Sequence, residues 1–169
     1  MGLLSFFKDA GEKLFGHGQA QAAQAAAKAE PSPEKIAAAN DAAGNAIVDY
    51  IHTMNLDAAG LSVKFDAASG QVEVSGEAAD QETREKIVLC CGNVAGVGGV
   101  SDLMTTATPA DESQYYTVVR GDTLSKIAKQ FYGNANAYMQ IFEENKPMLT
   151  HPDKIYPGQM LRIPPNAKA

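Results

Sequence analysis

The chain has 169 residues, of which 45% are hydrophobic and 20% are charged, a length that suits one domain or two compact modules rather than a large enzyme. No apolar run approaches the roughly 18 residues that a membrane-spanning helix needs. Twenty acidic against fourteen basic residues give a formal net charge of −6, which repels nucleic acid phosphates, so nucleic acid is not an expected partner.

The first fifteen residues predict a short amphipathic helix. Leu3, Phe7, Ala10 and Leu14 recur at helical spacing. The segment lacks a basic n-region, and Lys8 interrupts it before the apolar core of a secretory signal can form. We therefore expect a cytoplasmic protein.

Residues 16–34 are rich in alanine and glutamine and predict a linker. At its end, Ser32 can cap a helix that has Pro33 at its first position. Apolar residues then repeat at helical spacing to about residue 54: Ile36, Ala43, Ile47, Ile51 and Met54. This helix opens a first module, predicted over residues 35–107.

The rest of the first module reads as strand, strand, helix and strand. Two segments of alternating polarity surround a turn at residues 68–70 and predict a β-hairpin. Asp80 can cap a second helix, which we expect Gly92 to end, and a strand should finish near Thr106. Within this helix Cys90 and Cys91 are adjacent, a spacing typical of core thiols rather than of disulfides or metal sites.

A second module is predicted over residues 115–165, after a linker at 108–114. Residues 115–119 read as a strand, and Thr123 or Asp122 can cap a following helix. A further helix, a proline-punctuated loop and a closing strand at 160–163 complete the order strand, helix, helix, strand. The predicted fold class is therefore α+β, with two small modules after a short N-terminal helix.

Two motifs of the second module resemble the paired signatures of LysM domains: Gly-Asp-Thr-Leu at 121–124 and Tyr-Pro-Gly-Gln at 156–159. The first module resembles a BON domain (αββαβ) in its element order, in Val-Glu-Val-Ser-Gly at 72–76 and in the loop at 92–100. Together with the N-terminal segment, this combination is similar to a family of cytoplasmic potassium-binding proteins of bacteria. The resemblance implies K⁺ as the ligand, and a protein that senses or buffers it.

Backbone carbonyl oxygens are the groups that hold K⁺ selectively. The loop at 92–100 has four glycines in nine residues and starts at a helix C-terminus, where carbonyls are unpaired and carry partial negative charge. The N-terminal helix offers further carbonyls, so binding would join it to the BON module and compact the chain. The predicted ligands are the carbonyls of Phe7, Ala10, Gly92, Val94 and Val97. The alternative is that this loop is only a turn.

The resemblance to LysM domains implies an alternative function, the binding of N-acetylglucosamine polymers such as peptidoglycan. The implied groove comprises Gly121, Asp122, Thr123, Leu124, Ile155, Tyr156 and Pro157. Because no export signal is found, we expect the LysM module instead to dock against the ion-bound BON module and stabilise it.

Catalysis has little support in the sequence. His17, His52 and His151 lie far apart, and none belongs to a recognisable nucleophile motif. The resemblance to BON domains also implies a possible membrane surface, but Lys8 and Asp9 illustrate the balanced charge of the N-terminal segment, which argues against it. We expect a monomer that is not an enzyme.

Overall fold

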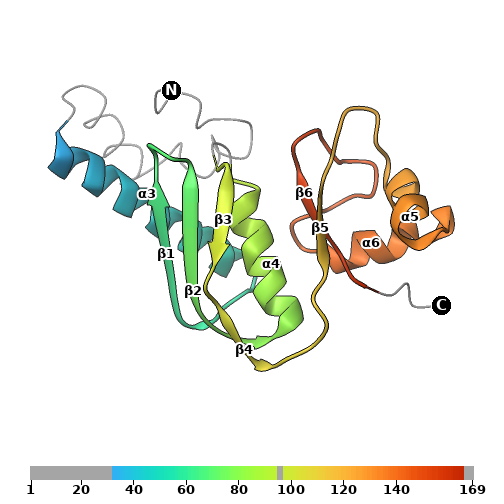
Figure 1. The fold of residues 1–169 in the computed structure, drawn as a ribbon, viewed down its shortest axis with the longest axis horizontal. Helices are drawn as coiled ribbons and strands as arrows, with labels where there is room; N and C mark the ends of the chain where they lie inside the picture. Colours follow the sequence, from blue (N-terminus) through green and yellow to red (C-terminus); the bar gives the residue numbers. More distant parts are fainter. Residues whose placement is uncertain (1–31, 95–96, 166–169) are drawn as a thin grey trace.

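The computed structural model describes residues 32–94 and 97–165, which form two units joined by a connecting segment (Figure 1). Most of the predicted linker and the whole predicted N-terminal helix lie outside the described residues. The predicted α+β class is confirmed, and the predicted elements occur in the predicted order, with one additional strand in the first unit and one additional 3-10 helix in the second. The first unit contains α3 (Pro33–Thr53), β1 (Ala59–Asp66), β2 (Gln71–Asp80), α4 (Gln81–Gly92), β3 (Gly99–Asp102) and β4 (Thr105–Thr108). The second contains β5 (Gln114–Thr117), α5 (Leu124–Tyr132), the 3-10 helix η2 (Ala135–Ala137), α6 (Tyr138–Glu144) and β6 (Met160–Ile163).

Helix α3 begins where the sequence predicts. The Ser32 side chain accepts a hydrogen bond from the Lys35 N–H at 3.2 Å, which satisfies one of the unpaired donors of the first turn. Its apolar face packs on the sheet, and Gly44 allows a close approach because a Cβ there would lie 2.4 Å from the Val63 carbonyl oxygen. Ile36 departs from the predicted stripe and is 40% exposed, since the first turns of α3 extend beyond the sheet (Figure 1).

The sheet has the antiparallel hairpin β1–β2 on one side and two parallel strands on the other. Helices α3 and α4 lie on the same face of this sheet (Figure 1). Side chains alternate along the strands, so that Val63 and Phe65 of β1 and Val72 and Val74 of β2 face the helices. These residues join Ile47, Ile51, Ile87 and both cysteines in one core.

The last part of the BON-like unit differs from the single strand that the sequence predicts. Met104 is buried and its N–H donates to the Asp102 carboxylate at 2.9 Å, which bends the chain between β3 and β4. Both short strands nevertheless pair with β2, β3 against its first half and β4 against its second. Because of this bend, β3 and β4 together can follow the twist of the longer strand β2.

The sequence predicts that Gly92 ends α4 through the freedom of its backbone, and the structure shows a different role for this glycine. The Asp80 cap is as predicted, with its side chain accepting from the Thr83 N–H at 2.7 Å. At the other end, Gly92 is the last helical residue, and the cap is Asn93 with an ordinary φ of −89°. The glycine is therefore not explained by backbone conformation.

In the second unit, α5, α6 and the two-stranded sheet β5–β6 share one hydrophobic core. The Thr123 side chain, rather than that of Asp122, caps α5 by accepting from the Lys126 N–H at 3.2 Å. Gly133 then ends α5 in the left-handed conformation, with φ of 68°. The closing strand β6 has the predicted bounds, whereas β5 is shorter than predicted and starts at Gln114.

No helix among residues 32–94 and 97–165 is both long enough and apolar enough to cross a membrane.

Candidate functional site

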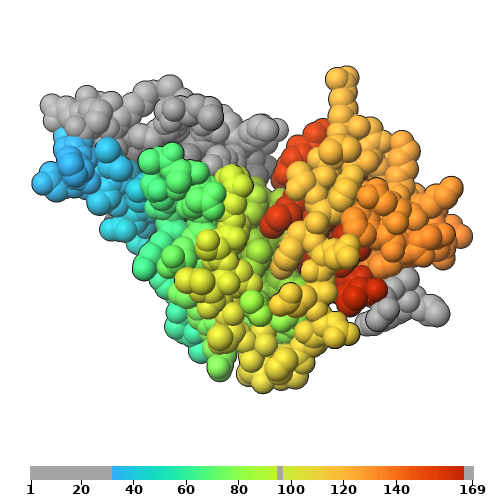
Figure 2. All heavy atoms as spheres, in the orientation of Figure 1, coloured from blue at the N-terminus to red at the C-terminus, as the bar shows by residue number. Residues whose placement is uncertain are grey.

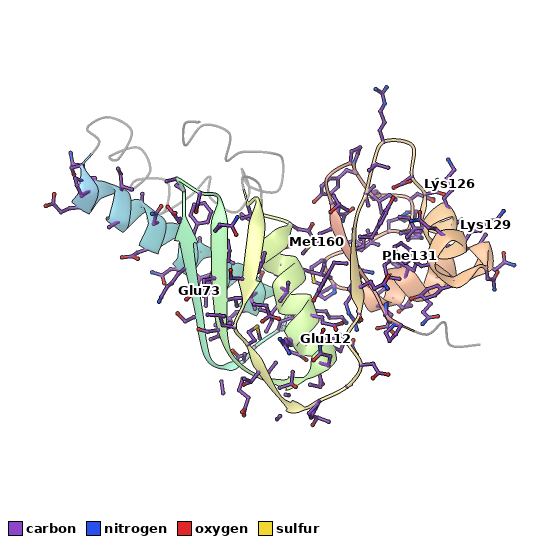
Figure 3. All side chains as sticks on the ribbon, viewed as in Figure 1. Glu73, Glu112, Lys126, Lys129, Phe131 and Met160 are labelled. Atoms are coloured by element: carbon purple, nitrogen blue, oxygen red, sulfur yellow. The ribbon has the colours of Figure 1, made fainter. Side chains whose placement is uncertain are left out.

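The two units meet where α4 lies beside β6 (Figure 1). At this junction a Cβ on Gly92 would lie 2.3 Å from the Met160 methyl group, so the glycine makes room for a side chain of the other unit. Figure 3 shows Met160 between α4 and β6. The connecting segment after β4 lies across the same junction on the face seen in Figure 2.

Asn93, directly after α4, binds the backbone of β6 through both ends of its side-chain amide. Its Oδ1 accepts a hydrogen bond from the Met160 N–H at 2.7 Å, and its Nδ2 donates to the Met160 carbonyl at 3.0 Å. A peptide group of a neighbouring strand would make the same two bonds. The residue that caps α4 therefore also completes an edge of the second unit's sheet.

Asn145, after α6, binds the backbone of Arg162, two residues further along β6, in the same way. Its Oδ1 accepts from the Arg162 N–H at 2.8 Å, and its Nδ2 donates to the Arg162 carbonyl at 2.9 Å. Residues 160 and 162 present their backbone groups to the same edge of the strand, because alternate residues of a strand do so. Two asparagines, one from each unit, thus cover the edge of β6 that β5 does not pair.

The Arg162 side chain is the centre of a buried charged network between the units. Its Nε donates to Glu85 of α4 at 2.9 Å, and its Nη1 donates to the Glu144 carboxylate at 2.7 Å. Arg162 is 5% exposed and Glu85 is 2% exposed. Ser113 of the connecting segment adds its N–H to Glu85 at 2.8 Å and accepts from Arg162 through its hydroxyl at 3.3 Å.

Hydrogen bonding decides the ionisation of Glu85. Burial by itself would raise the pKa of this carboxyl, but the hydrogen bonds it accepts, led by those from Ser113, outweigh burial and lower its pKa below the ordinary value of 4.5. Glu85 is therefore ionised at neutral pH, and Arg162 compensates its charge.

The predicted ion site falls partly on this junction. Gly92 contacts Met160, Val94 is buried at 5% exposure, and Val97 packs on the core of the first unit. The Val94 carbonyl accepts a hydrogen bond from the Val97 N–H at 3.2 Å, so the chain folds back on itself here. The other two predicted ligands, Phe7 and Ala10, lie outside the described residues.

Charge is distributed unequally between the two units. Residues 32–108 contain eleven acidic and four basic residues, a formal charge of −7, whereas residues 115–165 contain four acidic and six basic residues, a formal charge of +2. The first unit therefore provides a field that concentrates cations. Among residues 32–94 and 97–165, no group of three or more His, Cys, Asp or Glu side chains is arranged to hold a metal ion.

The residues of the predicted LysM groove lie in two loops that are joined at their base. The Gly158 N–H donates to the Val118 carbonyl at 2.7 Å, which connects the loop before α5 to the loop before β6. Asp122 is engaged within its own loop, where it accepts from the Tyr116 hydroxyl at 2.7 Å and from the Val119 N–H. Most of the remaining groove residues are exposed: Gly121, Thr123, Pro157 and Tyr156, the last at 45%. Ile155 is half-buried and Leu124 is buried.

Both cysteines lie in the core of the first unit with no exposed surface. Burial raises the pKa of the Cys90 thiol to about 12 and also raises that of Cys91. Both thiols are protonated at neutral pH, which agrees with the structural role that their burial in the core indicates.

Comparison with known proteins agrees with this two-unit architecture. The BON domain model matches residues 46–108, and the LysM domain model matches residues 116–164. The chain is 44% identical over 166 residues to the potassium binding protein Kbp of Escherichia coli O6:H1, an alignment that covers 97% of this chain and 99% of that protein. The chain belongs to this family.

Two further relatives match over shorter stretches. An uncharacterized protein of Deinococcus radiodurans is 51% identical over 49 residues, which cover 29% of this chain and 19% of that protein. The protein YqbP of Bacillus subtilis is 38% identical over 58 residues, and the alignment covers 26% of its length. The resemblance to the potassium-binding BON and LysM family is confirmed over nearly the whole chain, and both matched domains are of binding rather than enzymatic families.

Sequence reasoning missed the residues that hold the BON and LysM domains together. Glu85 and Arg162 are 77 positions apart, and Asn93 and Met160 are 67 positions apart. One local sign pointed to a partner: Arg162 is a charged residue within the otherwise apolar strand Met-Leu-Arg-Ile, and a charged residue that such a strand buries needs a partner. Neither Asn93 nor Glu85 has such a sign in its sequence context.

Proposed function

We propose that this chain binds K⁺ in the cytoplasm, and that it senses or buffers the ion rather than catalysing a reaction. The observation that carries the proposal is the 44% identity, over nearly the full length of both chains, to a protein named for potassium binding. The alignment covers both the BON and the LysM domain of this chain, so the similarity is not confined to one of the two domains, which supports the transfer.

The ligands that we propose are backbone carbonyls of the BON domain loop after α4 and of the N-terminal segment: Gly92, Val94 and Val97 with Phe7 and Ala10. The C-terminus of α4, which carries partial negative charge, leads directly into this loop. A carbonyl oxygen has two lone pairs, so the Val94 oxygen can accept the bond from Val97 and still ligate an ion. The formal charge of −7 on residues 32–108 favours a cation there.

The proposal includes a change of compactness. An ion shared by residues 7, 10 and 92–97 would join the N-terminal helix at 1–15, across the linker at 16–34, to the BON domain at 35–107. The LysM domain at 115–165, reached through the linker at 108–114, would stabilise this state because Asn93 connects the loop to β6. Ion binding and domain docking would then favour one another, as any two events that stabilise the same state must.

Calorimetric titration of the metal-stripped protein with potassium chloride tests the function. Sodium chloride at equal ionic strength is the matched control, and small-angle scattering on the same samples reports the radius. We expect saturable heat and a smaller radius with K⁺ alone. Equal responses to the two salts would contradict the proposal.

Two substitutions separate backbone from side-chain coordination. Gly96→Val restricts the backbone of the loop and should weaken K⁺ binding, whereas Asp9→Asn removes a carboxylate near the proposed ligands Phe7 and Ala10 and should change it little. Equal losses from both variants would contradict coordination by carbonyls.

Binding of N-acetylglucosamine polymers is the alternative function. The observation in its favour is that Gly121 and Pro157 of the LysM groove are exposed and that Tyr156 is 45% exposed. A pull-down on purified peptidoglycan tests it. Retention of the protein without any potassium-selective heat would favour this alternative.

A further inference from the structure

The junction of the two domains also contains a cavity of about 230 Å³. The BON domain contributes Tyr50 of α3 and Asn93, and the LysM domain contributes a loop with Thr150, Lys154, Tyr156 and Gln159. The volume lies below the roughly 300–1,000 Å³ that is typical of pockets for drug-sized ligands. An occupant of this cavity is therefore a small molecule, and it would touch both domains.

The side chains around this cavity have hydrogen-bond donors without partners. The hydroxyls of Tyr50, Thr150 and Tyr156 and the ammonium group of Lys154 make no hydrogen bond or ion pair with any residue of the described ranges 32–94 and 97–165. Three hydroxyls and one cation thus remain for a ligand.

The two side-chain amide oxygens at the cavity, in contrast, each accept a hydrogen bond within the protein. The Gln159 Oε1 accepts from the Tyr156 N–H at 3.3 Å, and the Asn93 Oδ1 accepts from the Met160 N–H at 2.7 Å. Each amide oxygen thus accepts one hydrogen bond within the protein, and each amide nitrogen retains at least one unused N–H. The described lining includes no aspartate or glutamate, although the chain as a whole has more acidic than basic residues.

Burial raises the pKa of both phenols further above neutral pH. Desolvation, followed by the proximity of Cys90 and Tyr156, raises the pKa of Tyr50 to about 12. Burial also raises the pKa of Tyr156. Both hydroxyls are protonated at neutral pH, as donors to an anion must be.

We propose that this interdomain cavity binds a small organic carboxylate. Lys154 supplies the charge, and the hydroxyls of Tyr50, Thr150 and Tyr156 supply neutral donors. Because the walls come from both domains, the ligand binds only their docked arrangement and stabilises it by mass action. The donors of this site are side chains rather than the carbonyls proposed for K⁺, although Asn93 lies between the proposed ligands Gly92 and Val94, and the proposal does not rest on the K⁺ function.

Titration with sodium succinate, followed by ¹⁵N–¹H spectra of the full chain at fixed potassium chloride, tests this site. Inorganic phosphate and sodium chloride at the same ionic strength are the parallel arms. We expect saturable shifts at Asn93, Thr150, Lys154 and Tyr156 with succinate, and only uniform, unsaturated drift with chloride. Saturation by phosphate without saturation by succinate would overturn the carboxylate assignment, and no saturation in either arm would overturn the site.

Two lysine variants make the test specific. Lys154→Gln should weaken succinate binding roughly tenfold or more, which is the loss expected for one charge-assisted hydrogen bond. Lys129→Gln removes the same charge from α5, on the side of the LysM domain away from the BON domain (Figure 3), and should leave binding unchanged. Equal losses in the two variants would show a general charge effect and overturn the proposal. Tyr50→Phe, which removes one donor from the other domain, should also weaken binding.

Discussion

The two ends of the interface between the BON and LysM domains are built from different chemistry. At one end Glu85, Arg162 and Glu144 form a charged network in which Glu85 and Arg162 are almost fully buried. At the other end Asn93 and Met160 form a neutral, partly buried contact beside a cavity and beside the loop of the proposed ion ligands. The closed, charged end fixes how the domains dock, whereas the open, neutral end is the part that a ligand can change.

Arg162→Met should break the charged end and have the largest effect on stability. It leaves Glu85 buried without its cation, a change that costs about 3–5 kcal/mol in comparable buried pairs. Urea denaturation measures the free energy of unfolding, and Arg120→Met, at an exposed position of the LysM domain, is the control. A loss no larger than that of the control would mean that the network contributes nothing to docking.

Asn145→Ala and Asn93→Ala sharpen the comparison, because each removes an amide that binds both backbone groups of one β6 residue. Asn145 is 1% exposed, so its loss leaves buried groups without partners and should cost about 2–4 kcal/mol. Water can replace the partly buried Asn93 amide, and its loss should cost about 1 kcal/mol.

The two asparagine variants should rank in the opposite order for ion binding. Asn93→Ala should lower the K⁺ affinity more than Asn145→Ala, since only Asn93 adjoins the proposed ligands. Urea denaturation ranks the two variants by stability, and calorimetry on the same samples ranks them by K⁺ affinity. The same order in both measurements would mean that affinity only follows global stability.

The charged end should make docking sensitive to acid. Because the pKa of Glu85 is lowered in the folded state, its contribution to stability is complete above the ordinary value of 4.5 and is lost as the pH falls through that value towards the folded pKa. The urea concentration at the midpoint of unfolding should therefore decrease as the pH is lowered below about 5. Glu85→Gln should be less stable at neutral pH and should show a shallower decline, and an unchanged slope would place the acid sensitivity elsewhere.

Gly92→Ala should have the smallest effect, about 1 kcal/mol or less, because the new Cβ meets the flexible end of Met160 rather than backbone. The cost should disappear in the background of Met160→Ala, which removes the obstructing methyl group. A double-mutant cycle of the two changes measures this coupling. Additive effects would show that the contact does not explain the glycine.

Local signals in the sequence were sufficient for most elements of the fold. Ser32, Asp80 and Thr123 each accept from a backbone N–H three residues later, so their role depends only on their immediate neighbours. The alternation of polarity placed the hairpin β1–β2, and the Met-Leu-Arg-Ile segment placed β6. The signature motifs of the LysM domain were likewise contiguous and therefore readable.

The tertiary structure alone decided the role of residues whose partners are distant in the chain. Gly92 was predicted to end the helix but makes room for Met160, and Asn93, which directly follows α4, completes the edge of β6. Glu85 has no distinguishing sign in the sequence, yet it is buried against Arg162 from the other domain. Local conformation follows from short-range sterics and hydrogen bonds that neighbouring residues encode, whereas these contacts exist only after two separately encoded domains have docked.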